Sequence, residues 1–241
     1  HIEFQRDILI EEGIKLGRPS SLIIDKELEE YKEADYISTP SVFAKETFLK
    51  RGINESKIIQ VSLGVDINVF KPIHKQDSIF RVVFVGGMNM HKGVHHLLKA
   101  VSELRLKNFE TWLIGGINYD IKPFLKRYAG SFKYIGKVLQ RQLHRYLSQG
   151  SAFVLFSIDD GFGMALLEAM ACGLPVICST HVGAKDAVRD GVDGFILPNR
   201  DVEALKEKIT YFYEHPEACR EMGRQARANV ESNFTWQHYG A

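Results

Sequence analysis

Short runs of β-branched, aliphatic and aromatic residues alternate with segments of helical period over residues 80–197. This alternation predicts an α/β fold, in which a parallel sheet is wrapped by helices. The runs expected to form strands are 80–85, 110–114, 132–135, 152–156, 176–178 and 194–197. We therefore expect one parallel sheet to occupy this part of the chain.

Apolar residues recur with the helical period between these runs, and the stripes that they form should face the sheet. The stripes comprise Val94, Leu97, Leu98, Val101 and Leu104 in one helix, and Leu139, Leu143, Tyr146 and Leu147 in a later one. After the last strand, Asp201 stands where a helix N-cap belongs. Two closing helices are expected there, the second near residues 217–229.

The first part of the chain follows a different pattern. Residues 1–33 are charge-rich and helical in character, and strands are expected at 35–39 and 57–61. Between these strands, Ser41 supplies a helix start and Gly52 a stop. The segment therefore predicts a single β-α-β unit.

Two strands do not form a stable sheet alone, so this β-α-β unit is expected to be the remnant of a larger domain whose beginning is absent. The turn-forming stretch 63–72 is typical of a linker. We therefore expect the chain to divide into a remnant of an amino-terminal domain, residues 1–72, and a second domain, residues 73–241.

Composition and charge exclude several classes of protein. The 31 lysines and arginines against 30 acids give a formal charge of +1, which provides no field for holding nucleic acid. No apolar run approaches the ~20 residues of a membrane-spanning helix, and a cytoplasmic protein is expected. The three cysteines have no metal-like spacing, which indicates buried, reduced thiols.

The loop after the first strand of the sheet is a candidate for anion binding. It contains Gly86 and Gly87, which permit close backbone approach, and Lys92 just before a predicted helix. The loop is neither a GxGxxG turn nor a Walker loop, which disfavours a dehydrogenase or a nucleotide triphosphatase. A tight turn with a solvated lysine is the alternative interpretation of this segment.

The loop after residues 152–156 carries a stronger signal. The strand ends in acids that include Asp160, a Gly-x-Gly turn begins a helix at Gly163, and Glu168 lies one turn inside that helix. In an otherwise apolar helix, a carboxylate loses hydration energy unless a partner binds it, and a pair of ligand hydroxyls would be such a partner. The alternatives are that Glu168 pairs with an internal basic residue or points to water.

These residues resemble glycosyltransferase family four, also called group one, whose donor domain carries E-x7-E within EGFGxxxLEAMAxGxPVI. The match is almost unbroken from Gly161 to Ile177, with Asp160 and Glu168 in the two acidic positions, so the pattern here is D-x7-E. Further matches in the family's order lie at residues 34–37, 40–41, 57–59, 64–66, 70–72, 136–138 and 190–194. The resemblance implies the two-domain GT-B architecture, with residues 73–241 as its Rossmann-like, donor-binding carboxy-terminal domain.

The resemblance also implies a set of donor-binding positions. Glu168 is implied to bind the ribose hydroxyls, Asp160 to face the transferred sugar, and Lys92 to neutralise the leaving diphosphate. The turn at the helix start would hold the diphosphate through backbone amides, and the segment after the third strand would lie along the base. The remaining positions are Gly86, Gly87, Lys137, Val138, Gly161, Phe162, Gly163, Met164 and Ala165. Gly87 replaces a basic residue that is usual in the family.

The implied activity is transfer of a hexose from a UDP-, GDP- or ADP-sugar to an acceptor hydroxyl, with retention of the anomeric configuration and without a metal ion or other cofactor. The acceptor would be a sugar, a polysaccharide or a glycolipid, and a lipid acceptor would bring the protein to the inner face of the membrane. Because the family supplies further catalytic groups from its amino-terminal domain, we expect this chain alone to be poorly active.

Other functions remain as alternatives at this stage. A partner subunit that only binds a nucleotide sugar is motivated by Asp160 and Gly87, and an epimerase can share the architecture. His91, His95 and His96 have a spacing that can suit zinc, but no acidic or cysteine ligand is nearby in sequence. We therefore predict no metal site and interpret the histidines as a solvated helix end.

Overall fold

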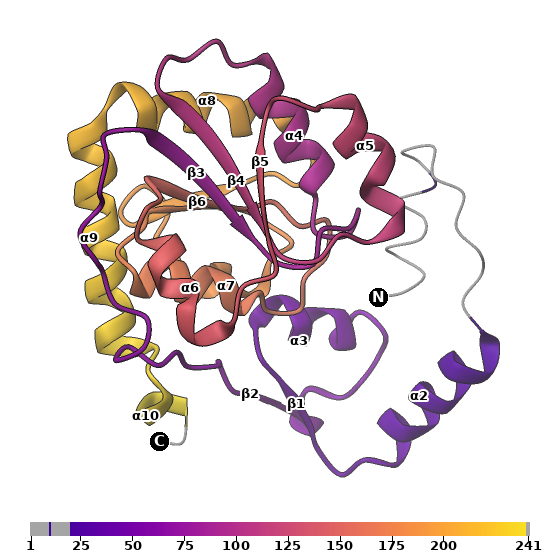
Figure 1. The fold of residues 1–241 in the computed structure, drawn as a ribbon. Helices are drawn as coiled ribbons and strands as arrows, with labels where there is room; N and C mark the ends of the chain where they lie inside the picture. The colour runs from indigo at the N-terminus through magenta and orange to yellow at the C-terminus, as the bar shows by residue number, and fades with distance from the viewer. Residues whose placement is uncertain (1–9, 11–19, 240–241) are drawn as a thin grey trace.

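Two parallel β-sheets organise the computed structural model, which describes Ile10 and residues 20–239 (Figure 1). The larger sheet has six strands in the order β5-β4-β3-β6-β7-β8, and every neighbouring pair is parallel. Its strands are β3 (Phe80–Val85), β4 (Phe109–Ile114), β5 (Lys133–Gly136), β6 (Ala152–Leu155), β7 (Val176–Ser179) and β8 (Gly194–Leu197). The predicted parallel sheet is confirmed, with each strand boundary within one residue of the expected one.

Helices cover both faces of this sheet. On one face lie α4 (Val94–Glu103), α5 (Lys122–Arg127) and α8 (Val202–Glu214), and on the other α6 (Gln140–Leu147) and α7 (Met164–Ala171), with α9 (Pro216–Asn233) packed along α7. The 3-10 helices η2 (Tyr119–Ile121) and η3 (Gly183–Ala187) follow β4 and β7. Because both faces are covered, β3 is buried almost throughout, and its residues apart from Arg81 are apolar.

The helical stripes face the sheet with one exception. Val94, Leu97, Leu98 and Val101 are buried on α4, and Leu143 and Leu147 on α6. Leu139 is 58% exposed, so its assignment to the stripe was wrong. The reason is that Leu139 is the N-cap of α6 in extended conformation, where the helical period has not yet begun. The N-cap predicted at Asp201 is confirmed, because its side chain accepts a hydrogen bond from the Ala204 amide.

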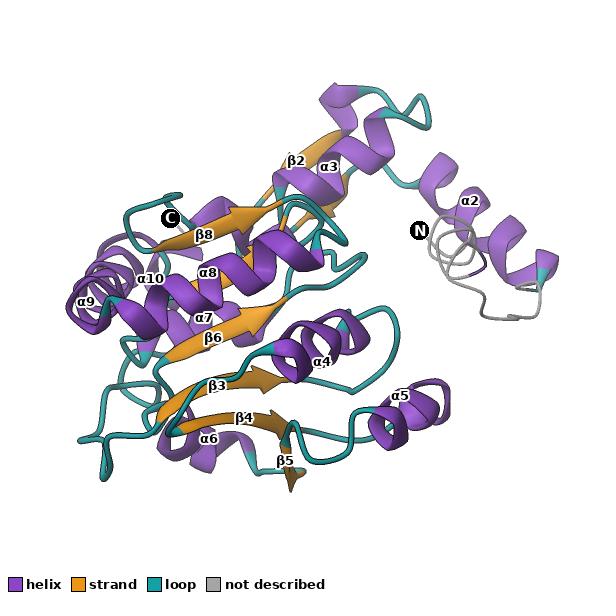
Figure 2. Ribbon diagram, turned by 90° about the horizontal axis from the view of Figure 1, so that it is seen from above, coloured by secondary structure: helices purple, strands orange, loops and turns teal. Residues whose placement is uncertain are grey.

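The predicted β-α-β unit forms the smaller sheet. It contains β1 (Ile37–Thr39), α3 (Val42–Leu49), η1 (Glu55–Lys57) and β2 (Ile58–Gln60), preceded by α2 (Ser21–Glu33), which stands away from the larger sheet in both views (Figure 2). β1 and β2 pair in parallel. The helix also expected over residues 1–9 and 11–19 lies outside the described residues.

The stretch predicted as a linker is fixed to the larger sheet's helices. Arg227 on α9 donates to the carbonyls of Phe70 and Ala171, each at 2.6 Å. The Val65 amide donates to the Phe234 carbonyl at 2.9 Å, so the start of this stretch packs against the segment that leads into α10 (Trp236–Tyr239). Backbone groups of this stretch are therefore fixed by contacts to α9 and to the segment before α10.

Three further expectations concern burial. The three cysteines are buried free thiols, as predicted, and burial raises the pKa of each to about 12. None of the helices in the described part of the chain is long and apolar enough to cross a membrane. The histidines expected at a solvated helix end instead lie inside: His95 is 6% and His96 7% exposed, on the face of α4 that packs inward.

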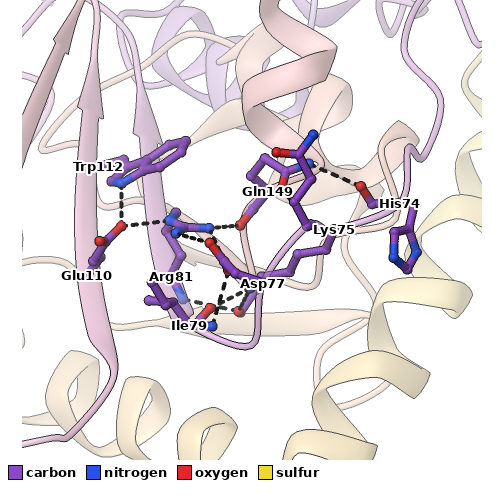
Figure 3. A network of polar contacts seen from close by, with 10 residues as sticks. His74, Lys75, Asp77, Ile79, Arg81, Glu110, Trp112 and Gln149 are labelled. Atoms are coloured by element: carbon purple, nitrogen blue, oxygen red, sulfur yellow. Dashed lines mark hydrogen bonds and ion pairs between the residues drawn. The ribbon is translucent and has the colours of Figure 1, made fainter.

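A charge network centred on the buried Arg81 joins the amino ends of β3 and β4 (Figure 3). Arg81 is 2% exposed and donates to Glu110 at 2.9 Å, to Asp77 at 3.0 Å and to the Gln149 carbonyl at 2.6 Å. Its guanidinium lies 4.1 Å from the centre of the Trp112 ring. The hydrogen bonds offset the desolvation of the guanidinium, which would otherwise be costly in the sheet.

Replacing Arg81 with methionine should therefore destabilise the protein strongly. The substitution removes the hydrogen bonds from the guanidinium to the half-exposed carboxylates of Asp77 and Glu110 and to the Gln149 carbonyl, and we expect a loss of about 1.5–3 kcal/mol in the free energy of unfolding, measured by urea denaturation. Arg224→Met is the matched control, because Arg224 is 76% exposed and its pairing with Glu221 should contribute less than about 1 kcal/mol. Equal losses in the two variants would contradict this account of the network.

Candidate functional site

Both candidate loops lie at the carboxyl edge of the larger sheet, where β3 and β6 are neighbours. The chain leaves β3 toward α4 on one face and leaves β6 toward α7 on the opposite face (Figure 1). The two loops therefore diverge and open the sheet edge between them, which is the position where parallel sheets of this kind bind ligands. The charge network around Arg81 occupies the opposite edge.

Lys92 and Asp160 meet across this point. The Lys92 ammonium lies 2.5 Å from a carboxylate oxygen of Asp160, and the Ser157 hydroxyl lies 3.4 Å from the same oxygen. The two side chains are 29% and 9% exposed. The alternative of a freely solvated lysine is therefore wrong, and the loops after β3 and β6 are joined by an ion pair at the edge of the sheet.

The turn that begins α7 requires glycine at position 163. Gly163 has φ +93°, and a Cβ there would lie 2.7 Å from Leu155 and 3.3 Å from the Asp160 carboxylate. The amides of the first turn of α7 have no acceptor within the helix, and the helix dipole makes this end positive. The turn thus presents backbone donors next to Asp160, an arrangement suited to an anionic ligand.

Backbone hydrogen bonds to η3 and the segment before it hold this turn. The Asp160 amide donates to the His181 carbonyl at 2.9 Å, and the Gly183 amide donates to the Asp160 carbonyl at 2.9 Å. The Ala184 amide donates to the Phe162 carbonyl at 2.6 Å. The orientation of the turn is therefore set by a neighbouring segment rather than by α7 alone.

Glu168 is buried one turn inside α7, with 5% of its surface exposed. Its carboxylate accepts a hydrogen bond from the side-chain amide of Gln140, at the start of α6. Burial raises the pKa of Glu168 to about 7, and the bond from Gln140 opposes this shift. Both alternatives considered for Glu168 are therefore wrong: among the described residues its side chain pairs with Gln140 and with no cation, and it is buried away from water.

Gln140 is the site residue that the sequence did not reveal. It precedes Glu168 by 28 residues and lies on another helix, so no local pattern connects the two. Its bond joins the start of α6, three residues after Lys137, to α7. A glutamine donor gives the carboxylate a partner without the strong neutralisation that a lysine or arginine would supply.

Residues 66–229 match the model of the family described as glycosyl transferases group 1. The matched segment is more than half of the 241 residues. The chain belongs to this family. The group 1 glycosyltransferase match includes the loops after β3 and β6, Gln140, and the whole of α7.

Curated relatives carry names within the same class. The chain is 26% identical over 222 residues to an uncharacterised glycosyltransferase of Methanocaldococcus jannaschii, covering 86% of this chain and 56% of that protein. It is 31% identical over 162 residues to glycogen synthase of Mycobacterium tuberculosis, covering 65% of this chain and 39% of that protein. The chain spans about half the length of the curated relatives it matches.

Solved structures share the fold of this group 1 glycosyltransferase. Sucrose-phosphate synthase from Thermosynechococcus elongatus superposes with a TM-score of 0.82 at 22% identity, covering 95% of this chain and 62% of that chain. HepE from Anabaena, in complex with UDP and glucose, gives 0.76 at 20% identity, covering 86% and 61%. These likenesses confirm the Rossmann-like fold of the GT-B glycosyltransferases.

The remaining predicted positions surround the same edge of the sheet. Gly86 directly follows β3 and its amide donates to the Ile114 carbonyl at 3.0 Å, whereas Gly87 is exposed. Lys137 is exposed and extends over Gly116, and Val138 is half-buried against the core. Gly161 and Phe162 form the turn before Gly163, and Met164 and Ala165 open α7 half-buried.

No group of three or more histidine, cysteine, aspartate or glutamate side chains within the described residues is placed to hold a metal ion. The rings of His95 and His96 lie 3.9 Å apart, measured between centroids, and His95 packs against Phe124. His91 is half-buried, and burial lowers its pKa below the ordinary value. The histidines are thus part of the packing beneath the loop after β3.

The raised pKa of Glu168 predicts that Glu168→Gln stabilises the folded protein relative to wild type, and that this gain in stability increases with pH. Because the folded state holds this proton up to about pH 7 and the unfolded state releases it near 4.5, wild-type stability falls as pH rises between these values. Urea denaturation should show the variant gaining stability relative to wild type by about 2–3 kcal/mol between pH 4.5 and pH 8.

Glu103→Gln serves as the control: hydrogen bonding to Lys206 lowers the pKa of Glu103 below 4.5, so its contribution to stability is lost only below that pH and the difference from wild type should stay nearly constant between pH 4.5 and pH 8. A difference between Glu168→Gln and wild type that stayed constant from pH 4.5 to pH 8 would show that Glu168 ionises normally in the folded protein.

Proposed function

We propose that this chain binds a nucleoside-diphosphate sugar at the carboxyl edge of the larger sheet. The observation that carries the proposal is the combination of Gly163 and Glu168 on α7. The amides at Gly163 are placed to bind an anion, and one turn deeper lies the buried carboxylate of Glu168, which pairs with no cation in the part of the chain that the structure describes. A nucleoside diphosphate has the matching order of groups, with an anionic diphosphate next to a pentose that offers two hydroxyls. Binding of UDP by HepE supports a UDP-sugar as the first donor to test.

Each predicted residue has a role in this proposal. The amides of Gly163, Met164 and Ala165 hold the diphosphate, with Gly161 and Phe162 shaping the turn. The Glu168 carboxylate accepts hydrogen bonds from the ribose hydroxyls. These bonds either replace the hydrogen bond from the Gln140 side-chain amide or are formed beside it. The base then lies along Lys137 and Val138, beside the glycines of the first loop, Gly86 and Gly87.

Lys92 and Asp160 are proposed to act on the transferred sugar. As the glycosidic bond to the diphosphate breaks, negative charge develops on the leaving phosphate, and an ammonium aimed at it stabilises the transition state. Lys92 would leave its ion pair for this phosphate, which frees the Asp160 carboxylate for hydroxyls of the hexose. The acceptor hydroxyl then attacks the anomeric carbon from the same face and gives its proton to the leaving phosphate, which results in retention without a metal ion.

The division of labour along the chain is part of the proposal. Residues 73–241 would bind the donor, and residues 1–72 would belong to the acceptor-side domain. Transfer to a sugar, polysaccharide or glycolipid is proposed for the whole protein, in the cytoplasm, and at the membrane face if the acceptor is a lipid. Because the acceptor-binding groups lie in that other domain, this chain alone should bind donor well and transfer it poorly.

A thermal-shift screen tests the donor site. UDP, GDP and ADP are compared at 1 mM, and the matching nucleotide should stabilise the protein by about 2.7 kcal/mol when present at 100 times its Kd, raising the unfolding midpoint by several degrees. Glu168→Ala should abolish this rise, whereas Glu103→Ala on the exposed side of α4 should retain it. A full shift in Glu168→Ala would remove Glu168 from the site.

Substitution of Lys92 tests the chemistry. Lys92→Gln should lower kcat by about 10²–10³-fold because it removes charge stabilisation from the transition state, with Lys99→Gln on the exposed face of α4 as the control. The assay is sugar release or transfer from the donor by the whole protein, with product analysis. An unchanged kcat would contradict the role of Lys92, and a donor that binds without any transfer would favour a binding subunit. A donor isomerised in the absence of acceptor would favour an epimerase.

A further inference from the structure

Ser41 connects the β-α-β unit to the turn before α7. Its side chain is fully buried, although it lies at the start of α3 in the first unit. The hydroxyl donates to the Gly161 carbonyl at 2.7 Å and accepts from the Ala44 amide at 3.0 Å. The hydroxyl proton of Ser41 is thus committed to a residue 120 positions away in sequence.

Three segments meet at this contact with no space between them. A Cβ at Gly183 would lie 2.1 Å from the Gly161 carbonyl oxygen and 2.5 Å from the Ser41 hydroxyl. Ser41 follows the carboxyl end of β1, and Gly161 follows the carboxyl end of β6. The carboxyl edges of the two sheets therefore meet at the turn that begins the candidate site.

Two more contacts hold the first turn of α3 against η3 and the residues just before it. The Val42 amide donates to the Asp186 carboxylate at 2.7 Å. The rings of Phe43 and His181 stack with centroids 5.4 Å apart and an interplanar angle of 27°. The start of α3 is thereby placed against the same segment that binds the Phe162 carbonyl through Ala184.

These bonds determine where the amides of the turn point. A peptide group is planar, so the direction of a carbonyl fixes the direction of the following N–H group. Ser41 fixes the Gly161 carbonyl and with it the N–H of Phe162, and the bond from Ala184 to the Phe162 carbonyl fixes the N–H of Gly163. The peptide plane between Gly161 and Phe162 is thus held by a residue of the β-α-β unit.

We propose that Ser41 is a positioning residue for the diphosphate: it fixes the peptide between Gly161 and Phe162, where the turn begins, and so makes the geometry of the turn depend on where the β-α-β unit sits. The inference rests on the proposed function and adds a residue to it from outside the donor-binding segment. Without the hydroxyl, the Gly161 peptide can rotate, and the turn then loses its preset orientation toward an anion.

The test compares Ser41→Ala with Ser41→Thr, which keeps a hydroxyl, and with two controls. Ser38→Ala removes an exposed serine of the same unit, and Asp201→Ala removes a helix cap of the same kind on α8. The first readout needs no ligand: hydrogen exchange at the amides of Asp160, Gly183 and Ala184. Loss of one hydrogen bond should raise these rates about tenfold in Ser41→Ala and leave them unchanged in both controls.

The second readout is binding of UDP, GDP and ADP by calorimetry, compared with binding of the corresponding nucleosides. Ser41→Ala should lower the affinity for the nucleoside diphosphate that wild type binds by about tenfold and leave the affinity for the nucleoside unchanged. Ser41→Thr should restore the affinity for the diphosphate. Unchanged exchange, or equal weakening of nucleotide and nucleoside, would overturn the role of Ser41 and leave the donor site intact. If wild type binds none of the three diphosphates, the proposed function itself fails, whatever the exchange rates show.

Discussion

Burial of a carboxylate inside an apolar helix is the constraint on which the rest of this site depends. Glu168 loses most of its hydration on α7, and its pKa rises to about 7 in consequence. A single neutral donor, Gln140, offsets only part of that loss. A ligand with two hydroxyl donors would complete the solvation of the carboxylate, which is why we place the ribose there.

The rest of the sheet edge is arranged around that helix. Gly163 allows a tight turn before α7, so that the first amides of the helix lie beside Asp160. Lys92, in the loop after β3, forms an ion pair with Asp160, in the loop after β6. Stability is supplied at the opposite edge, where Arg81 and its partners join the amino ends of the strands. The proposed binding groups and the charge network around Arg81 thus lie at opposite ends of the strands.

The sequence predicted the fold well because its periodicities are local and strong. Runs of buried residues defined every strand of the larger sheet, and Asp201 marked a helix start that the structure confirms. The predicted burial of Leu139 was wrong because the apolar stripe was extended to the residue before the first residue of α6. His95 and His96 failed because polar character was interpreted as exposure, whereas packing against Phe124 and Phe156 keeps both rings inside.

The site was predictable in part. The turn and the acids of the loop after β6 are contiguous in sequence, and so a motif could reveal them. Gln140 and Ser41 reach the site from other elements, through contacts 28 and 120 residues apart in sequence. Such contacts depend on how helices pack across the sheet edge, which no single-sequence periodicity encodes. The ion pair between Lys92 and Asp160 was likewise visible only once β3 and β6 were known to be neighbours.

A crystal structure with bound UDP tests the central claim most directly. The account predicts electron density for the diphosphate against the amides of Gly163, Met164 and Ala165, and for the ribose hydroxyls within hydrogen-bonding distance of Glu168. A nucleotide bound elsewhere on the molecule, or a diphosphate at this turn with Glu168 bonded only to Gln140, would contradict it.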